Sequence, residues 1–111
     1  CGACTLFLDG VTARSCLTLA VQADGAQITT IEGYETDKNA SDLIKNFHNR
    51  NALQCGYCTA GMLATSIEYI EKCNPADREK VKEHISGNYC RCTGYQAIVD
   101  AICTTIEERQ G

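Results

Sequence analysis

Nine cysteines occur in the 111 residues of this chain, and the spacing of four of them suggests metal chemistry. Cys55 and Cys58 form a C-x-x-C pair, and Cys90 and Cys92 form a C-x-C pair. Closely spaced cysteines bring their sulfurs toward one point, which suits a metal ion or an iron–sulfur cluster. A 2Fe–2S cluster needs four thiolates, two on each iron. The spacing therefore predicts such a cluster on these four cysteines.

Two other uses of the cysteines stay open at this level. A structural zinc also accepts four thiolates, although zinc ribbons more often carry two C-x-x-C pairs with a shorter gap than that between Cys58 and Cys90. A disulfide framework would join distant segments, and an odd number of cysteines cannot pair completely within one chain. Cys73 and Cys103 match no motif, and we predict that both are small buried apolar residues.

A second set of cysteines lies at the start of the chain. Plant-type ferredoxins bind their cluster through C-x4-C-x2-C and a distant fourth cysteine. Cys1 and Cys4 match the second and third of these ligands, and Cys16 lies where a nearby fourth ligand could sit. The first ligand would fall five residues before Cys1. We therefore expect the natural chain to extend upstream and to carry that cysteine.

The elements that would position these cysteines differ between the two parts of the chain. Residues 1–34 have the pattern of three short strands, at residues 5–8, 17–22 and 28–31, which would form an antiparallel meander. Asp9-Gly10 and Asp24-Gly25 are tight-turn pairs between apolar runs. The strand at residues 17–22 is inferred from alternation, with Leu17, Leu19 and Val21 on one face.

Residues 35–111 contain the patterns of four helices and no convincing strand. The first helix would begin at Ser41 as its N-cap, and the second would span residues 59–72 with Thr59 as its N-cap. In the second helix Glu68 lies off the apolar stripe. The third helix would end near residue 87, and the fourth would run from just after residue 93 to about residue 109. Two helices would thus start directly after paired cysteines, where the helix N-terminus stabilises an anion.

Composition and charge exclude several functions. The net charge of −4 and the lack of any basic run argue against nucleic-acid binding. No apolar stretch approaches the ~20 residues of a membrane span. The chain has no Ser-His-Asp set, phosphate loop or dinucleotide fingerprint, so we predict no catalytic residue in it. Free thiolates as metal ligands imply a reducing compartment, and we predict a cytoplasmic protein.

Three stretches resemble one known family. They are CGACT at residues 1–5 with the DG pair at 9–10 and SCL at 15–17, QCGYCTAGM at 54–62, and GNYCRCTGY at 87–95. Together they resemble the small iron–sulfur subunit of the molybdenum hydroxylases, the xanthine dehydrogenase, aldehyde oxidoreductase and carbon monoxide dehydrogenase family. The resemblance covers essentially the whole chain.

The resemblance implies a fold of the α+β class in two domains. Residues 1–34 would be a partial ferredoxin-like β-grasp that lacks its opening strands, and residues 35–111 would be an all-α four-helix domain. It implies two 2Fe–2S clusters. The cluster nearer the molybdenum cofactor would lie on the four cysteines of the second half, and the cluster nearer a flavin would lie on Cys1, Cys4 and Cys16.

The resemblance also implies partners. Gln54 and Cys92 would contact the molybdopterin cofactor, which a large partner subunit carries, and a medium subunit would carry FAD. Electrons would pass from the molybdopterin centre through both clusters to the FAD. The chain would act as an electron-transfer subunit of an oxidoreductase that is not catalytic alone, in a heterotrimer or its dimer.

Overall fold

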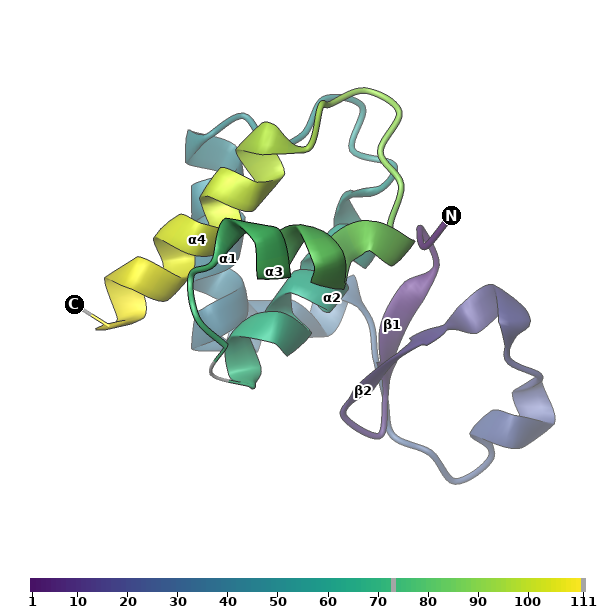
Figure 1. Ribbon diagram of the computed structural model, residues 1–111. Coiled ribbons are helices and arrows are strands. Elements are labelled where there is room, and N and C mark those ends of the chain that lie inside the picture. The colour runs from purple at the N-terminus through teal and green to yellow at the C-terminus, as the bar shows by residue number, and fades with distance from the viewer. Residues whose placement is uncertain (73, 111) are drawn as a thin grey trace.

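The computed structural model describes residues 1–72 and 74–110, and it confirms the order of a small sheet followed by helices. The sheet contains β1 (Thr5–Leu8), β2 (Val11–Arg14) and β3 (Ile28–Thr29). The described residues also form four α-helices, which are α1 (Lys38–Asn49), α2 (Thr59–Glu71), α3 (Arg78–His84) and α4 (Gln96–Gln110). The sheet lies to one side of the helices, and β1 and β2 contact α2 (Figure 1).

The turn at Asp9-Gly10 forms as the sequence predicts, but the strand after it is Val11–Arg14, which the sequence patterns did not predict, and the strand order does not follow the chain. Asp9 and Gly10 adopt φ of 52° and 80°, as the two central residues of a tight hairpin turn require. The order is β2-β1-β3, so β1 is the central strand and the predicted meander is wrong. The backbone N–H of Asp9 donates to the carbonyl of Gln27 at 2.8 Å, and its carboxylate accepts from the N–H of Gln27 at 2.8 Å. These bonds bring the returning chain to the open edge of β1.

The predicted strand at residues 17–22 is absent. The segment instead forms two 3-10 turns, Ser15–Leu17 and Ala20–Ala23. The N–H of Gln22 donates to the carbonyl of Leu19 at 2.9 Å, and the side-chain oxygen of Gln22 accepts from the N–H of Leu19 at 2.8 Å. Such local bonds compete with a strand ladder. The alternating apolar residues therefore face solvent, with exposed fractions of 80%, 66% and 76% for Leu17, Leu19 and Val21.

Helix α1 begins earlier than the sequence predicts. Its N-cap is Asp37, whose carboxylate accepts from the N–H groups of Asn39 at 2.7 Å and Ala40 at 3.4 Å. Ser41, the predicted cap, already donates its N–H to the carbonyl of Asp37 within the helix. An acidic cap also suits the positive end of the helix dipole, which explains why Asp37 takes this position.

Replacement of Asp37 by Ala is expected to lower the free energy of unfolding by about 1 kcal/mol, because two backbone donors lose their acceptor. Asp37→Asn keeps the acceptor and should retain most of that stability. Ser41→Ala should change stability by less than about 0.5 kcal/mol, because its side chain is exposed. Urea unfolding of the three variants tests this order, and a larger loss for Ser41→Ala than for Asp37→Ala would contradict it.

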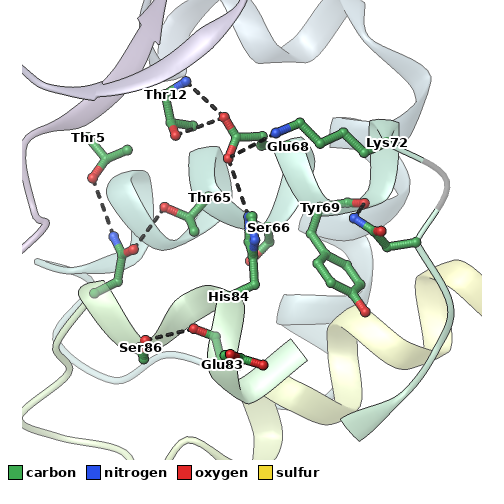
Figure 2. A network of polar contacts seen from close by, with 12 residues as sticks. Thr5, Thr12, Thr65, Ser66, Glu68, Tyr69, Lys72, Glu83, His84 and Ser86 are labelled. Atoms are coloured by element: carbon green, nitrogen blue, oxygen red, sulfur yellow. Dashed lines mark hydrogen bonds and ion pairs between the residues drawn. The ribbon is translucent and has the colours of Figure 1, made fainter. Parts of the chain in front are cut away.

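Helix α2 is buried along most of its length and joins the sheet to the helices. Its N-cap is Cys58 rather than the predicted Thr59. Glu68, placed by the sequence off the apolar stripe, is only 9% exposed. Its Oε2 accepts from the N–H and the hydroxyl of Thr12 on β2, at 3.0 and 2.9 Å (Figure 2). Burial raises the pKa of Glu68, but these bonds, with the Lys72 ammonium and the nearby His84 side chain, outweigh it and hold the pKa below its ordinary value.

The core lies between the four helices and extends to β1. The chain before α1 is part of the core, because Tyr34 is buried. Its ring packs edge-to-face against that of Phe7, with the ring centroids 5.8 Å apart. The predicted domain boundary between residues 34 and 35 stays a prediction. In the described part of the chain, no helix has both the length and the apolar character to cross a membrane. The largest fully buried side chains include Phe47, Leu43, Met62, Ile67, Ile70, Ile98 and Ile102.

Candidate metal centre

The first cysteine pair lies in the turn that leads into α2. Gly56, between the two cysteines, has φ of 83°, a backbone conformation that glycine adopts without strain. The N–H of Thr59 donates to the carbonyl of Gly56 at 3.2 Å and closes the turn. Cys58 then caps α2, and Cys55 lies on the exposed side of the loop. The predicted placement of this pair at a helix start is confirmed.

The second pair lies in a loop that is longer than predicted. Helix α4 begins at Gln96, so Cys92 does not directly precede it. Tyr95 has a φ of 67°, which is not a helical conformation. The side chain of Thr93 is hydrogen-bonded to Sγ of Cys90. The expected symmetry of two helices opening at paired cysteines is therefore only partial. In this loop the N–H and the hydroxyl of Thr93 provide hydrogen bonds to Sγ of Cys90.

The sulfurs of the two pairs meet across the loops. The sulfurs lie near enough to influence one another's titration, because Cys92 lowers the pKa of Cys55 and Cys90 raises the pKa of Cys58. Among residues 1–72 and 74–110, no three His, Cys, Asp or Glu side chains converge on a single-ion position. The two loops thus bring four thiols to one region of the surface, the number of ligands that a 2Fe–2S cluster needs.

Donors surround these sulfurs as a bound thiolate requires. The N–H and the hydroxyl of Thr93 donate to Sγ of Cys90 at 3.4 and 3.1 Å, and the N–H of Tyr57 donates to Sγ of Cys55 at 3.5 Å. The hydroxyl of Tyr95 accepts from the N–H of Cys90 at 2.8 Å and fixes the loop. Hydrogen bonds to the sulfurs are one of the factors that set a cluster's potential. The residues present therefore fit a 2Fe–2S cluster.

The pKa values of the thiols differ in direction. The hydrogen bond from the backbone of Tyr57, with a further bond from Cys92, lowers the pKa of Cys55. Burial raises the pKa of Cys90, but the bonds from Thr93 outweigh it and the pKa falls below its ordinary value. Burial, with the neighbouring Cys90, raises the pKa of Cys58 to about 11.

These directions predict an order of alkylation in cluster-free protein near neutral pH. Cys55 should react before Cys58, because Cys55 is exposed and has a lowered pKa. The pKa of Cys58 lies about two units above the ordinary value of 9.0. Near neutral pH, Cys58 therefore has a thiolate fraction roughly a hundredfold smaller than that of an ordinary cysteine. Its thiolate is more nucleophilic, which offsets part of this, so alkylation of Cys58 should be about tenfold slower than that of an ordinary cysteine.

Mass spectrometry of iodoacetamide-treated peptides measures this order. Raising the pH toward 11 should accelerate Cys58 selectively, and the rates should converge in denaturant. Equal rates for Cys55 and Cys58 in the folded, cluster-free protein would contradict the assigned environments.

The N-terminal cysteines form a second, separate group. Sγ of Cys4 and Sγ of Cys16 lie within hydrogen-bond distance, 3.3 Å apart, because the β1–β2 hairpin places the chain after Arg14 beside the chain before Thr5. Hydrogen bonds from the backbone N–H and then from the thiol of Cys16 lower the pKa of Cys4, and the side-chain bond to Cys4 raises the pKa of Cys16. A surface cavity of about 500 Å³ is lined by Cys1, Cys4, Cys16, Arg14, Leu17 and Tyr57. The structure thus brings two of these three sulfurs into contact and the third to the same cavity.

The other candidate residues fall into clear places. The side-chain amide of Gln54 donates to the carbonyl of Cys92 at 3.1 Å, and both residues are exposed, so they form one accessible edge of the site.

Cys103 is buried and free, as predicted, and Cys73 lies outside the described residues. All cysteines in the described residues are free. Sequence reasoning missed Thr93 and Asn88, whose only signal is their place in the motif at residues 87–95.

Comparisons with known proteins agree with this geometry. A family model described as a [2Fe-2S] binding domain matches residues 30–103. The chain is 51% identical over 102 residues to the nicotine 6-hydroxylase small subunit of Paenarthrobacter nicotinovorans, with 92% of this chain and 61% of that protein covered. It is 38% identical to the xanthine dehydrogenase iron-sulfur-binding subunit of Escherichia coli O157:H7, with 92% and 65% covered.

Solved structures give the same result. The crystal structure of quinoline 2-oxidoreductase from Pseudomonas putida 86 contains a chain that is 50% identical, with a TM-score of 0.85 over all of this chain and 70% of that one. The aldehyde oxidoreductase from Desulfovibrio gigas matches all of this chain with 37% identity and a TM-score of 0.86, over 13% of its own length. The α+β fold class is thereby confirmed.

The fold and the family match define a 2Fe–2S-binding protein. The chain belongs to the family of small iron–sulfur subunits of molybdenum hydroxylases, as the sequence motifs predicted. It spans 61% and 63% of the lengths of two curated relatives, the nicotine 6-hydroxylase small subunit and the caffeine dehydrogenase subunit gamma.

Proposed function

We propose that this chain is the electron-transfer subunit of a molybdenum-containing hydroxylase. The proposal is supported above all by the two loops that carry Cys55 with Cys58 and Cys90 with Cys92. In these loops Tyr57 donates a hydrogen bond to Sγ of Cys55, and Thr93 donates to Sγ of Cys90. A bound 2Fe–2S cluster takes up and releases single electrons. The protein's contribution is to hold four thiolates, to donate hydrogen bonds to their sulfurs and to shield part of the site from water.

A second 2Fe–2S cluster forms part of the proposal. Cys1, Cys4 and Cys16 would provide three of its thiolates, which the contact between Cys4 and Cys16 and the shared cavity support. Electrons would pass from a molybdopterin centre to the cluster of the helical part and then through this cluster to FAD. Both cofactors would belong to partner subunits, a large molybdopterin subunit and a medium FAD subunit, in a heterotrimer or its dimer.

The exposed edge formed by Gln54 and Cys92 is the proposed contact with the molybdopterin. The amide of Gln54 is held by the carbonyl of Cys92, and both residues are accessible to a partner. No catalytic residue is assigned to this chain. A cytoplasmic location is part of the proposal, because free thiolates need a reducing environment.

The test is anaerobic purification of the complex that contains this chain, followed by optical and EPR spectroscopy. The proposal expects a coloured protein that dithionite bleaches, two distinguishable signals in the reduced state, and copurifying subunits with molybdenum and flavin. Colourless protein that contains zinc and no iron would overturn it in favour of a structural zinc module. One signal instead of two would remove the second cluster and leave the first.

A further inference from the structure

The loops that carry the two cysteine groups touch through their backbones. Tyr89 directly precedes Cys90, and its N–H donates to the carbonyl oxygen of Cys1 at 2.8 Å. One hydrogen bond and the adjacent peptide units therefore join a candidate ligand of one cluster to a candidate ligand of the other. No other backbone hydrogen bond in the described part of the chain connects these two loops.

Asn88 occupies the junction between the loops. It is 2% exposed, and its Nδ2 donates to the carbonyl of Gly2 at 3.1 Å and to the hydroxyl of Thr5 at 3.4 Å. Its Oδ1 accepts from the hydroxyl of Thr65 on α2 at 2.8 Å. Figure 2 shows Thr5 and Thr65, each at one end of a dashed hydrogen bond. One buried side chain thus links the N-terminal loop, helix α2 and the loop that contains Cys90.

Two glycines keep this junction tight. A Cβ on Gly2 would lie 2.7 Å from Nδ2 of Asn88 and 2.7 Å from the carbonyl oxygen of Gly87. A Cβ on Gly61 in α2 would lie 2.2 Å from the carbonyl oxygen of Gly2. The loop between Cys1 and Cys4 is therefore in direct contact with both neighbours, and it cannot approach them more closely.

A second polar link spans the same gap. The guanidinium of Arg14, at the end of β2, donates to the hydroxyl of Thr5 at 2.8 Å and to the carbonyl of Gly87 at 3.0 Å. Arg14 is only partly buried, whereas the Asn88 amide is fully buried and uses donor and acceptor together. Loss of a buried partner leaves polar groups unsatisfied, which costs more than loss of an exposed one. Asn88 is therefore the stronger constraint on the loops.

We propose that Asn88 is a positioning residue that fixes the separation of the two cysteine groups, and with it the distance between the two iron–sulfur centres. The inference rests on the proposed function, because it presupposes a cluster on each group. Asn88 contacts neither cluster's sulfurs in the described hydrogen bonds. It acts by holding the carbonyl of Gly2, and so the loop that contains Cys1 and Cys4, against the segment that leads to Cys90.

The test uses Asn88→Asp and Asn88→Ala in the intact complex. Asp keeps the size and the acceptor toward Thr65, but it loses the donor to Gly2 and places two oxygens face to face. Asn46→Ala is the matched control. Asn46 is also buried and hydrogen-bonded, to Thr105 at 2.9 Å and Glu108 at 3.0 Å, but it lies away from both loops.

Two measurements that do not depend on turnover report on the position of the loops. In both Asn88 variants, amide hydrogen exchange at Tyr89 should become about tenfold faster, because the N–H loses its fixed acceptor. The magnetic interaction between the two reduced clusters, measured by EPR relaxation, should weaken while both signals and the iron content persist. Asn46→Ala should lose stability without either change.

The outcomes separate this inference from the proposed function. Wild-type protein with iron for only one cluster would defeat the proposed pair of centres, whatever the Asn88 variants do. Two coupled signals in the wild type, with exchange and coupling unchanged in Asn88→Asp, would overturn the positioning role and leave the proposed function intact. If Asn88→Ala does not accumulate, Thr65→Val removes only the hydroxyl that anchors the amide and should shift both readouts in the same direction by less.

Discussion

Cys92→Ser is expected to remove one of two EPR signals and about half of the iron. The serine hydroxyl is far less acidic than a thiol and lacks the soft sulfur that iron–sulfur clusters need. Electron transfer out of the molybdenum centre should fall at least about 100-fold, since even outer partners of a metal ligand contribute up to that factor. Iron analysis, EPR of the dithionite-reduced complex and single-turnover flavin reduction measure the three effects.

Cys103→Ala is the matched control for this substitution. Cys103 is buried in α4 and makes no contact with the four proposed ligands in the described hydrogen bonds. Its replacement should leave the iron content and both signals unchanged. The ligand assignment is wrong if Cys92→Ser retains both signals and normal flavin reduction.

Gly61→Ala is expected to destabilise the protein by about 2 kcal/mol. The new methyl group would lie 2.2 Å from the carbonyl oxygen of Gly2 and 3.1 Å from that of Ala3. Backbone atoms cannot rotate away as a side chain would, so the N-terminal loop must shift from α2. Alanine favours the helix by about 1 kcal/mol over glycine, which offsets only part of the clash.

Gly94→Ala is the control for the steric argument, because a Cβ at Gly94 meets no atom within 4 Å. Its effect on the free energy of unfolding should stay within about 0.5 kcal/mol. Urea unfolding followed by circular dichroism compares the two variants. Equal stability of Gly61→Ala and wild type would show that the contact between α2 and the N-terminal loop is loose.

The features that sequence alone predicts correctly depend on short-range chemistry. Asp9-Gly10 forms a tight turn because two adjacent residues favour positive φ. The apolar stripe of α2 and the spacing of the cysteine pairs are equally local. In each case the residues that decide the structure lie within a few positions of one another.

The features that sequence missed depend on partners far along the chain. Glu68 is buried because Thr12, 56 residues away, provides two donors. Asn88 is a central residue because it meets the carbonyl of Gly2, 86 residues away. The alternation at residues 17–22 predicted a strand, but local hydrogen bonds of Gln22 formed turns and the apolar face stayed exposed. Periodicity alone does not reveal whether a strand has a neighbour.

The register of the first hairpin would have a consequence for the proposed second cluster. Thr5 pairs with Arg14, so the cysteine before one strand and the cysteine after the other face each other only while the intervening turn has two residues. One added or deleted residue would shift the opposing strand by a position and turn its side chains to the other face. If Cys4 and Cys16 bind one cluster as proposed, the length of that turn is constrained by ligands at the opposite end of the hairpin, with which the turn makes no contact.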